Sequence, residues 1–474
     1  MTLPAKFVER VLRDLGGTEG AALCAALDAE PPVSVRLNPA KTGADTLPAG
    51  PDAGLPVPEA AGLPALAIAG RVPWSRDGRY LAVRPSFTLD PDFHAGAYYV
   101  QEASSQFVGH LLAAVRTEGA RILDLCAAPG GKTTLYASLA GPDGLVVANE
   151  IDRRRASVLA DNVRKWGTGN VAVTTCEPRA LGDFEAWFDV VAVDAPCSGE
   201  GMFRKDPDAR GEWSEGNVKQ CAARQDEILR EAWRALKPGG TRVYSTCTFN
   251  RDEDEGALER MAAWAGDEIA ESEETAVEDA WGIVCGRVGA FRTFRFYPHR
   301  TCGEGFFAAV ARKSFDAGGR VRAPKARRTV FAAGDRKTAG ELARWVRNPG
   351  GMRFAAVADT CYAWYAAQAD AVRTLSEALP VIYSGVALGQ VFKGVLKPDP
   401  ALAFFDGLNR GALPAAELDD EETLRFLRRQ DIAAGGLAEG MNLVCSRGRA
   451  LGFAKRIGAR VNNLYPISLR IIKQ

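Results

Sequence analysis

Two cysteines follow strand-like segments of the chain in the same way. Cys197 stands on a turn after the apolar run "FDVVAVDAP", and Cys247 follows "GGTRVYST" fifty residues later. Ligands of open parallel sheets bind at the carboxyl ends of the strands, so two thiols placed there can face one pocket. Asp194, three residues before Cys197, would add a carboxyl group. A structural disulfide and two separately buried thiols are the alternatives.

Two thiols beside an acid suit covalent catalysis, in which one hard step is divided into easier ones. Methylation of cytosine at C5 is a reaction of this kind. A thiolate that adds at C6 converts the ring into an enamine whose C5 can attack a methyl sulfonium. An acid would favour protonation at N3, and a base must remove the C5 proton before the thiol is eliminated. The residue types around Cys197 and Cys247 match these needs.

A glycine-containing loop, "DLCAAPGGKTT", joins the first strand of this region to a helix. Gly130 and Gly131 let the backbone approach a ligand, and the helix that follows offers unpaired N–H groups. The loop is neither a Walker A motif, which would need glycine in place of Cys126, nor a GxGxxG motif. Glu150 follows Gly131 by 19 residues, where an acid that accepts hydrogen bonds from ribose hydroxyls is expected.

The elements that position these residues alternate between strand and helix. Five β-rich segments are separated by stretches with apolar residues at helical spacing, which predicts a parallel sheet covered on both faces. Two further strands joined by a loop predict an antiparallel hairpin. The expected strands are 121–126, 144–151, 170–175, 188–195, 241–247, 291–298 and 305–312. The pattern matches the seven-stranded, Rossmann-like class I fold of S-adenosylmethionine-dependent methyltransferases.

The chain has 474 residues, too many for one hydrophobic core. Shifts in composition divide it into five segments. We expect an N-terminal cap at 1–95, the α/β domain at 96–313, a basic linker at 314–328, a middle domain at 329–395 and a β-rich C-terminal domain at 396–474.

Bulk composition excludes several classes of protein. The formal net charge is +0, so any polyanion must bind at a local basic patch. Ten cysteines lie more than five residues apart, which excludes a CxxC zinc site, and we expect no metal. No apolar run approaches the roughly 20 residues that span a bilayer, and the N-terminus reads as an amphipathic helix rather than a leader. We therefore expect a cytoplasmic protein with reduced thiols and no membrane partner, which weakens the disulfide alternative.

Several motifs resemble those of the RNA 5-methylcytosine methyltransferases, in the same order, over residues 30–313. They read "YVQEASSQ", "DLCAAPGGKTT", "DAPCSGEGMFRKDP", "TCTFNRDEDEG" and "GFFAAVARK". The string "PCSGEGMFRKDP" is similar, within that family, to the bacterial small-subunit (16S) ribosomal RNA methyltransferase F group. The tail is similar to the PUA-like RNA-binding domain of the same group. The resemblance implies an N-terminal cap, a Rossmann-like domain, a middle domain and a PUA-like domain.

The resemblance also implies roles that spacing alone does not divide. Cys247 is the expected nucleophile, Cys197 assists product release, and Asp194 faces the cytosine and the methionine end of the cofactor. Glu150 is expected to hold the ribose of S-adenosylmethionine, and Glu177 its adenine, although the neighbouring Cys176 leaves this contact open. The loop expected to hold the cofactor comprises Cys126, Ala127, Ala128, Pro129, Gly130, Gly131 and Lys132.

The expected partner is ribosomal RNA or the small ribosomal subunit, bound by a monomer. Phe203 or Tyr244 could stack on a flipped cytosine, or either could belong to the core. Lys205 could also contact the cofactor or the base. Two alternatives stay open: transfer RNA as the substrate, and a non-catalytic ribosome-assembly factor, which we would expect to lose a thiol or the glycine loop. Besides the linker arginines, the candidate phosphate contacts are Arg204, Lys205, Lys455, Arg456, Arg460 and Arg470.

Overall fold

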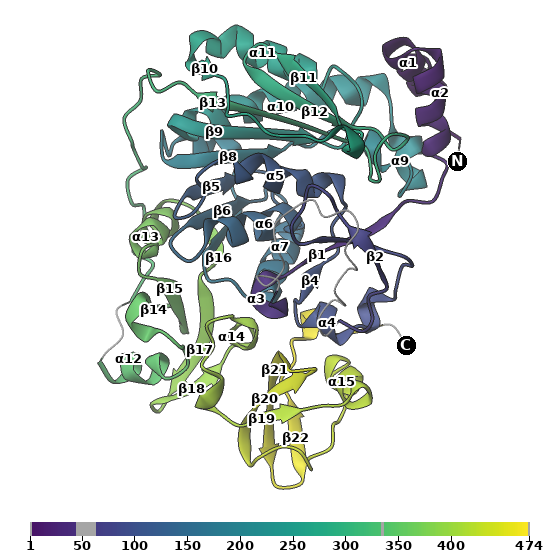
Figure 1. Ribbon diagram of the computed structural model, residues 1–474. Helices are drawn as coiled ribbons and strands as arrows, with labels where there is room; N and C mark the ends of the chain where they lie inside the picture. The colour runs from purple at the N-terminus through teal and green to yellow at the C-terminus, as the bar shows by residue number, and fades with distance from the viewer. Residues whose placement is uncertain (1, 44–62, 333–335, 473–474) are drawn as a thin grey trace.

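The computed structural model describes residues 2–43, 63–332 and 336–472. Most of the Pro- and Gly-rich connection expected before residue 65 lies outside these ranges. A ten-stranded mixed sheet forms the centre of the molecule, and smaller sheets from the two ends of the chain lie below it in Figure 1.

All seven strands expected from the sequence are confirmed, and they are adjacent in the central sheet. Five of them are parallel, and a hairpin completes the set at one side. In spatial order they are β7 (Val171–Thr174), β6 (Leu145–Asn149), β5 (Arg121–Asp124), β8 (Phe188–Asp194), β9 (Leu236–Thr246), β13 (Phe306–Lys313) and β12 (Phe291–Phe296). Three further strands extend the sheet: β10 (Ile269–Ala270), β11 (Val284–Val288) and β16 (Val381–Ser384).

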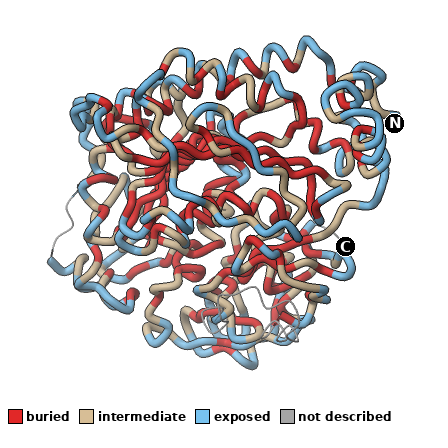
Figure 2. Tube along the Cα trace, turned by 45° about the horizontal axis from the view of Figure 1, so that its top comes forward, coloured by how far each residue is buried: buried red, intermediate tan, exposed pale blue. Residues whose placement is uncertain are grey.

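Helices cover both faces of the central sheet, as the alternating pattern predicts (Figure 1). Neighbouring strand residues such as Ile122 and Leu123 point to opposite faces and enter two different hydrophobic cores. The sheet is consequently buried on both sides, as the red band in Figure 2 shows. One core includes α5 (Phe107–Ala113), α6 (Gly131–Ala140) and α7 (Arg153–Trp166); the other includes α8 (Pro178–Gly182), α10 (Glu215–Ala235), α11 (Glu255–Ala265) and α13 (Ala369–Ala378).

The N-terminal segment contributes two helices and a small sheet. The sheet has the order β2 (Ile68–Arg71), β3 (Gly78–Leu81), β1 (Val33–Leu37), β4 (Tyr98–Tyr99), and the helices are α1 (Ala5–Leu15) and α2 (Gly17–Ala26). Phe7 of α1 packs edge-on against Phe203 and Trp213, with ring centroids 5.0 and 5.9 Å away. This packing brings α1 against the segments that follow β8 and β9.

The remaining segments form two four-stranded sheets. The first contains β14 (Met352–Val357), β15 (Thr360–Tyr365), β17 (Val386–Phe392) and β18 (Val395–Pro398). The second contains β19 (Ala415–Glu417), β20 (Gly440–Ser446), β21 (Arg449–Ile457) and β22 (Arg460–Asn463). The proposed middle domain is not isolated, because its strand β16 pairs with β7 of the central sheet. Its core also includes Leu443 and Phe453 of the last sheet.

Buried ion pairs attach the C-terminal sheet to α4 (Pro91–His94) of the N-terminal segment. The carboxylate of Asp92 is almost fully buried and pairs with Arg447 at 2.9 Å and with Arg449 at 2.8 Å. Nearby, the Tyr465 hydroxyl lies 3.3 Å from Nδ1 of His94, whose Nε2 lies 2.8 Å from the Thr88 carbonyl oxygen. Burial lowers the pKa of His94 to about 4.

This histidine predicts an acid sensitivity of the fold. Between about pH 6.5 and pH 4 the unfolded chain binds a proton at His94 that the folded chain does not. Lowering the pH from 7 to 4.5 should therefore cost roughly 2.5 kcal/mol of unfolding free energy through this group. His94→Gln, which cannot titrate, should lose less stability than the wild type in denaturant melts at the two pH values. Equal losses in both proteins would contradict the assignment.

Candidate active site

The two cysteine sulfurs meet at the carboxyl edge of the central sheet. β8 and β9 are parallel neighbours with Asp194 opposite Ser245, so the loops that leave them begin side by side. Sγ of Cys197 lies 3.2 Å from Sγ of Cys247, and both cysteines are free and half-buried. A disulfide would place the sulfurs about 2.05 Å apart. The expectation that both thiols face one place is confirmed, and the disulfide alternative is excluded.

The Cys197 thiol is held in its protonated form. Its hydrogen bond with Cys247, followed by burial and by the charge that Cys247 would carry, raises the pKa of Cys197 well above the usual value. A thiol that donates a hydrogen bond to its neighbour stabilises negative charge on that neighbour's sulfur. Cys197 is therefore the thiol of the pair, and it can donate a hydrogen bond to negative charge that forms on the Cys247 sulfur.

An ion pair stands beside the sulfurs. Nζ of Lys132, from the start of α6, lies 2.8 Å from Oδ2 of Asp194 at the end of β8. The Ser245 hydroxyl donates to the other oxygen of Asp194 at 2.7 Å. Burial alone would lower the pKa of Lys132, but the charge of Asp194 outweighs it and raises that pKa, and negative charge on Cys247 adds to the effect. Lys132 therefore keeps its positive charge, which interacts with the Cys247 sulfur.

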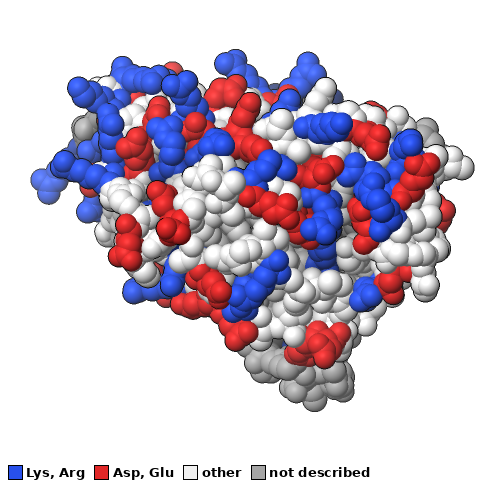
Figure 3. Space-filling view, turned by 90° about the horizontal axis from the view of Figure 1, so that it is seen from above, with Lys and Arg blue, Asp and Glu red and all other residues white. Residues whose placement is uncertain are grey.

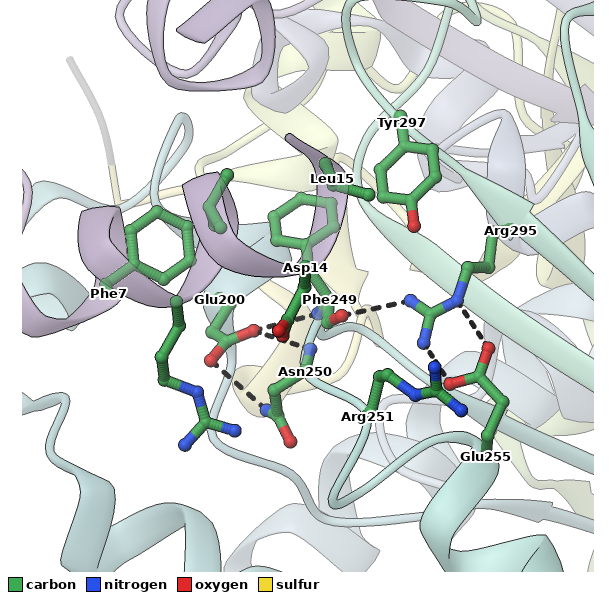
Figure 4. Close-up of a pocket in the computed structure, with 12 residues that line it drawn as sticks. Phe7, Asp14, Leu15, Glu200, Phe249, Asn250, Arg251, Glu255, Arg295 and Tyr297 are labelled. Atoms are coloured by element: carbon green, nitrogen blue, oxygen red, sulfur yellow. Dashed lines mark hydrogen bonds and ion pairs between the residues drawn. The ribbon is translucent and has the colours of Figure 1, made fainter. Parts of the chain in front are cut away.

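Two buried carboxylates, Glu200 and Glu253, connect the two cysteine loops, and they were not among the residues predicted from the sequence. The Glu200 carboxylate accepts from the Thr248 hydroxyl and from the backbone N–H groups of Phe249 and Asn250, at 2.8 to 2.9 Å. In Figure 4, Glu200 points at Asn250 beneath α1, at the wall of a pocket of about 200 Å³. Glu253 makes similar contacts with the Cys197 loop. Both acids lie in the quoted motifs, but nothing local shows that they are buried.

The cofactor loop has the shape that the sequence predicts. Gly130 has φ 111°, a left-handed conformation that favours glycine, and a Cβ there would lie 3.0 Å from Leu159. The loop is held by hydrogen bonds from Ala127 N to the Asn149 carbonyl and from Asn162 Nδ2 to the Pro129 carbonyl. It then runs into α6, whose first N–H groups are free of helical partners.

Two buried acids frame this loop. Asp124, at the end of β5, accepts from the Thr133 hydroxyl at 2.6 Å, and burial raises the pKa of Asp124 to about 7. Glu150, at the end of β6, is 4% exposed and accepts from the backbone N–H of Asp152 at 3.1 Å. A glycine-containing helix N-terminus beside a buried acid at the end of the next strand fits S-adenosylmethionine, with Glu150 as the predicted ribose contact.

The two residues considered for the adenine contact, Glu177 and Cys176, differ in their surroundings. Glu177 lies exposed at the start of α8. The neighbouring Cys176 is fixed by Asn149, because its backbone N–H donates to Oδ1 of Asn149 while its carbonyl accepts from Nδ2. The backbone of Cys176 therefore has a structural role, and Glu177 stays the predicted contact.

Two residues considered for stacking on the base belong to the core instead. Phe203 is fully buried in the cluster around Phe7, and Tyr244 is fully buried with its hydroxyl donating to the Glu253 carbonyl. Of the two alternatives that the sequence leaves open for these rings, the structure therefore shows the core. Both lie near reactive motifs, but their rings fill the space between elements that the sequence cannot show as neighbours.

The candidate RNA-binding residues differ in their exposure. Arg204 is buried in an ion pair with Glu304 at 3.0 Å, whereas Lys205 is exposed. Arg456 is half-buried and donates to the carbonyls of Ala434 and Leu437. On the face seen in Figure 3, basic side chains alternate with acidic ones. Among the candidate RNA-binding residues of the tail, Lys455, Arg460 and Arg470 are exposed.

The described ranges lack both a membrane-spanning helix and a metal-binding cluster. No helix in them is both long and apolar enough to cross a membrane. They also hold no group of three or more His, Cys, Asp or Glu side chains arranged to bind a metal ion.

The order of the central sheet and the loop after its first strand define an S-adenosylmethionine-dependent methyltransferase. The sequence matches three protein-family models. They are 16S rRNA methyltransferase RsmB/F over residues 111–312, the N-terminal domain of 16S rRNA methyltransferase RsmF over 3–103, and the methyltransferase RsmF PUA domain over 414–471.

Individual relatives agree with these matches. Ribosomal RNA small subunit methyltransferase F of Shewanella loihica is 32% identical over 84% of this chain and 83% of its own length. The protein of the same name from Erwinia tasmaniensis is 31% identical over 84% of each chain. A crystal structure of a methyltransferase homolog from Pyrococcus horikoshii is 27% identical, with a TM-score of 0.53, over 65% of this chain and 94% of its own. The chain belongs to the RsmB/F family of 16S rRNA methyltransferases.

Glu150 gives a direct test of the cofactor site. Glu150→Gln keeps the size of the side chain but removes the charge that would accept two ribose hydroxyls. We expect at least a tenfold weaker Kd for S-adenosylmethionine, about 1.4 kcal/mol, in isothermal titration calorimetry. Glu177→Gln, measured alongside, would identify the adenine contact through a comparable loss. An unchanged Kd for Glu150→Gln would contradict its placement at the ribose.

Proposed function

We propose that this protein methylates C5 of a cytosine in 16S ribosomal RNA through a covalent adduct with Cys247. The observation that carries the proposal is the contact between two free thiols, 3.2 Å apart, beside the Lys132–Asp194 ion pair. Covalent chemistry at an electron-poor ring needs a thiolate, a proton donor or acceptor and a fixed charge, and this edge of the sheet brings these groups together.

In the proposed reaction the Cys247 sulfur adds to C6 of the cytosine. The new S–C6 bond moves electron density to C5, which becomes the nucleophile. S-adenosylmethionine, held by residues 126–132 and Glu150, supplies the electrophilic methyl group. Asp194 and Lys132 are placed to orient the ring and to balance charge at N3.

Release then completes the reaction. A solvent water takes the proton from C5, the C5–H electron pair forms the C5=C6 double bond, and the S–C6 bond breaks with its electron pair returning to the Cys247 sulfur, which is recovered as a thiolate. Cys197 is in contact with Cys247 and is held as a thiol, so we assign it to this stage. The thiol of Cys197 stabilises the departing sulfur by a hydrogen bond, without itself bonding to the base.

The substrate is proposed from the relatives rather than from a visible RNA site. The names of the relatives specify the small ribosomal subunit, and residues 414–471, which match the RsmF PUA domain, are the segment that we assign to RNA binding. Transfer RNA stays the alternative substrate. A non-catalytic assembly factor is disfavoured because both thiols and the glycine loop are intact and correctly placed. The monomeric state and cytoplasmic location stay predictions.

Substitution of each cysteine should have a different outcome. Cys247→Ala should abolish methyl transfer and covalent trapping by RNA that contains 5-fluorocytosine, because no thiolate can add to C6. Cys197→Ala should instead accumulate a protein–RNA adduct with ordinary RNA, visible as a shifted band on a denaturing gel. Cys285→Ala, an exposed thiol outside the site, serves as the control and should behave like the wild type.

Two results would overturn the proposal. Methyl transfer by Cys247→Ala would remove the covalent step, and free turnover by Cys197→Ala would reverse the assignment of roles. The RNA target is a separate question. Bisulfite sequencing of ribosomal and transfer RNA from a strain that lacks the gene should show one or more unmethylated cytosines in 16S RNA.

A further inference from the structure

Two glutamates between the cysteine loops have no part in the chemistry described above, yet both are almost completely buried. Glu200 is 1% exposed and Glu253 is 0% exposed. Burying a carboxylate is costly unless hydrogen bonds replace its hydration. Burial accordingly raises the pKa of Glu253 above its usual value. We therefore expect the Glu253 carboxylate to have a specific function that offsets the cost of burying it.

The donors to the Glu253 carboxylate are neutral amides. Oε2 accepts from the backbone N–H of Ser198 at 2.9 Å and from Nε2 of Gln225 at 2.9 Å, while Oε1 accepts from Nδ2 of Asn250 at 2.7 Å. These donors come from three places in the chain: the Cys197 loop, helix α10 and the Cys247 loop. A single carboxylate therefore ties together both cysteine loops and the helix that packs beneath them.

The arrangement fixes Cys197 from both sides. Ser198, directly after the cysteine, is bound by Glu253. Pro196, directly before it, accepts a hydrogen bond at 3.0 Å from the same Gln225 side chain that donates to Glu253. Across the gap, the Ser198 hydroxyl lies 3.1 Å from the Thr248 hydroxyl, next to Cys247.

We propose that Glu253 is a positioning residue for the release step, holding the Cys197 loop so that its sulfur stays against that of Cys247. This inference rests on the proposed covalent mechanism. The hydrogen bonds of Glu253 go to groups beside Cys197 rather than to either sulfur, so it positions the loop through Ser198 and Gln225, and its charge adds to the rise in the pKa of Cys197. Glu200 holds the Cys247 loop by accepting hydrogen bonds from the backbone N–H groups of residues 249 and 250.

Glu253→Ala tests the proposal through the fate of the adduct. Removing the carboxylate frees the Ser198 N–H and lets Cys197 move, so resolution should slow more than formation. We expect a protein–RNA adduct with unmodified RNA, as for Cys197→Ala, together with at least a tenfold fall in kcat and less than a threefold change in KM. Glu253→Asp keeps the charge but shortens the side chain. It should accumulate more adduct than the wild type and less than Glu253→Ala.

Glu255→Gln is the matched control. Glu255 is a half-buried carboxylate, two residues along the chain, but its partner is Arg295 rather than the Cys197 loop. Its loss should lower the melting temperature without changing the ratio of adduct to product. A Glu253→Ala protein that shows this same behaviour, or wild-type turnover, would overturn the positioning role.

Gln225→Met keeps the proposal testable if Glu253→Ala does not fold. It preserves the shape of the buried side chain while removing its donor to the Pro196 carbonyl, and it should also accumulate adduct. Gln225→Met with no adduct and normal kcat would overturn the proposal. The wild type distinguishes a failure of the covalent mechanism from a failure of the positioning role. If the wild type forms no Cys247-dependent adduct with 5-fluorocytosine RNA, the covalent mechanism fails. If the wild type forms that adduct and the Glu253 and Gln225 variants turn over like the wild type, the positioning role alone fails.

Discussion

The parallel pairing of β8 with β9 is the constraint on which the site depends. It sets Asp194 opposite Ser245 and starts both cysteine loops from the same sheet edge. The strands themselves are buried on both faces by apolar residues, which makes their register costly to change. The contact between the two sulfurs is thus a product of the hydrophobic core, although neither Cys197 nor Cys247 belongs to that core.

Strand pairing alone does not determine the positions of atoms beyond the strand ends. Loops usually run over the surface and are mobile there, because solvent satisfies their backbone groups. In this protein the loops after β8 and β9 instead satisfy each other: Gly201 N donates to the Cys247 carbonyl, and Glu200 accepts from backbone N–H groups beyond it. Helix α1 adds apolar cover through Phe7. Buried polar networks of this kind give a unique geometry when every group has a partner.

Much of the fold and part of the site could be predicted from the sequence, and the misses have physical causes. The seven strands were predicted because each is a short apolar run bounded by turns, and Cys197 and Cys247 because they share a position relative to those strands. Strand β16 was missed because it joins the sheet through pairing with residues about two hundred positions earlier. Glu253 sits among other acids in "NRDEDEG", a pattern typical of an exposed loop, and only the tertiary fold buries it. The place of Phe203 stayed open at the sequence level, since an aromatic residue near a motif suits a binding surface and a core equally well, and the structure shows it in the core.

The attachment of the C-terminal sheet to α4 has a consequence for recognition. Swinging that sheet away would leave the Asp92 carboxylate buried without Arg447 and Arg449, which is strongly unfavourable. The ion pairs therefore hold the C-terminal sheet in a set orientation against the N-terminal segment. An RNA that touched both the C-terminal sheet and the sheet edge that carries the cysteines would need its two points of contact at a matching separation and angle. A short linear copy of such an RNA could reach only one of the two.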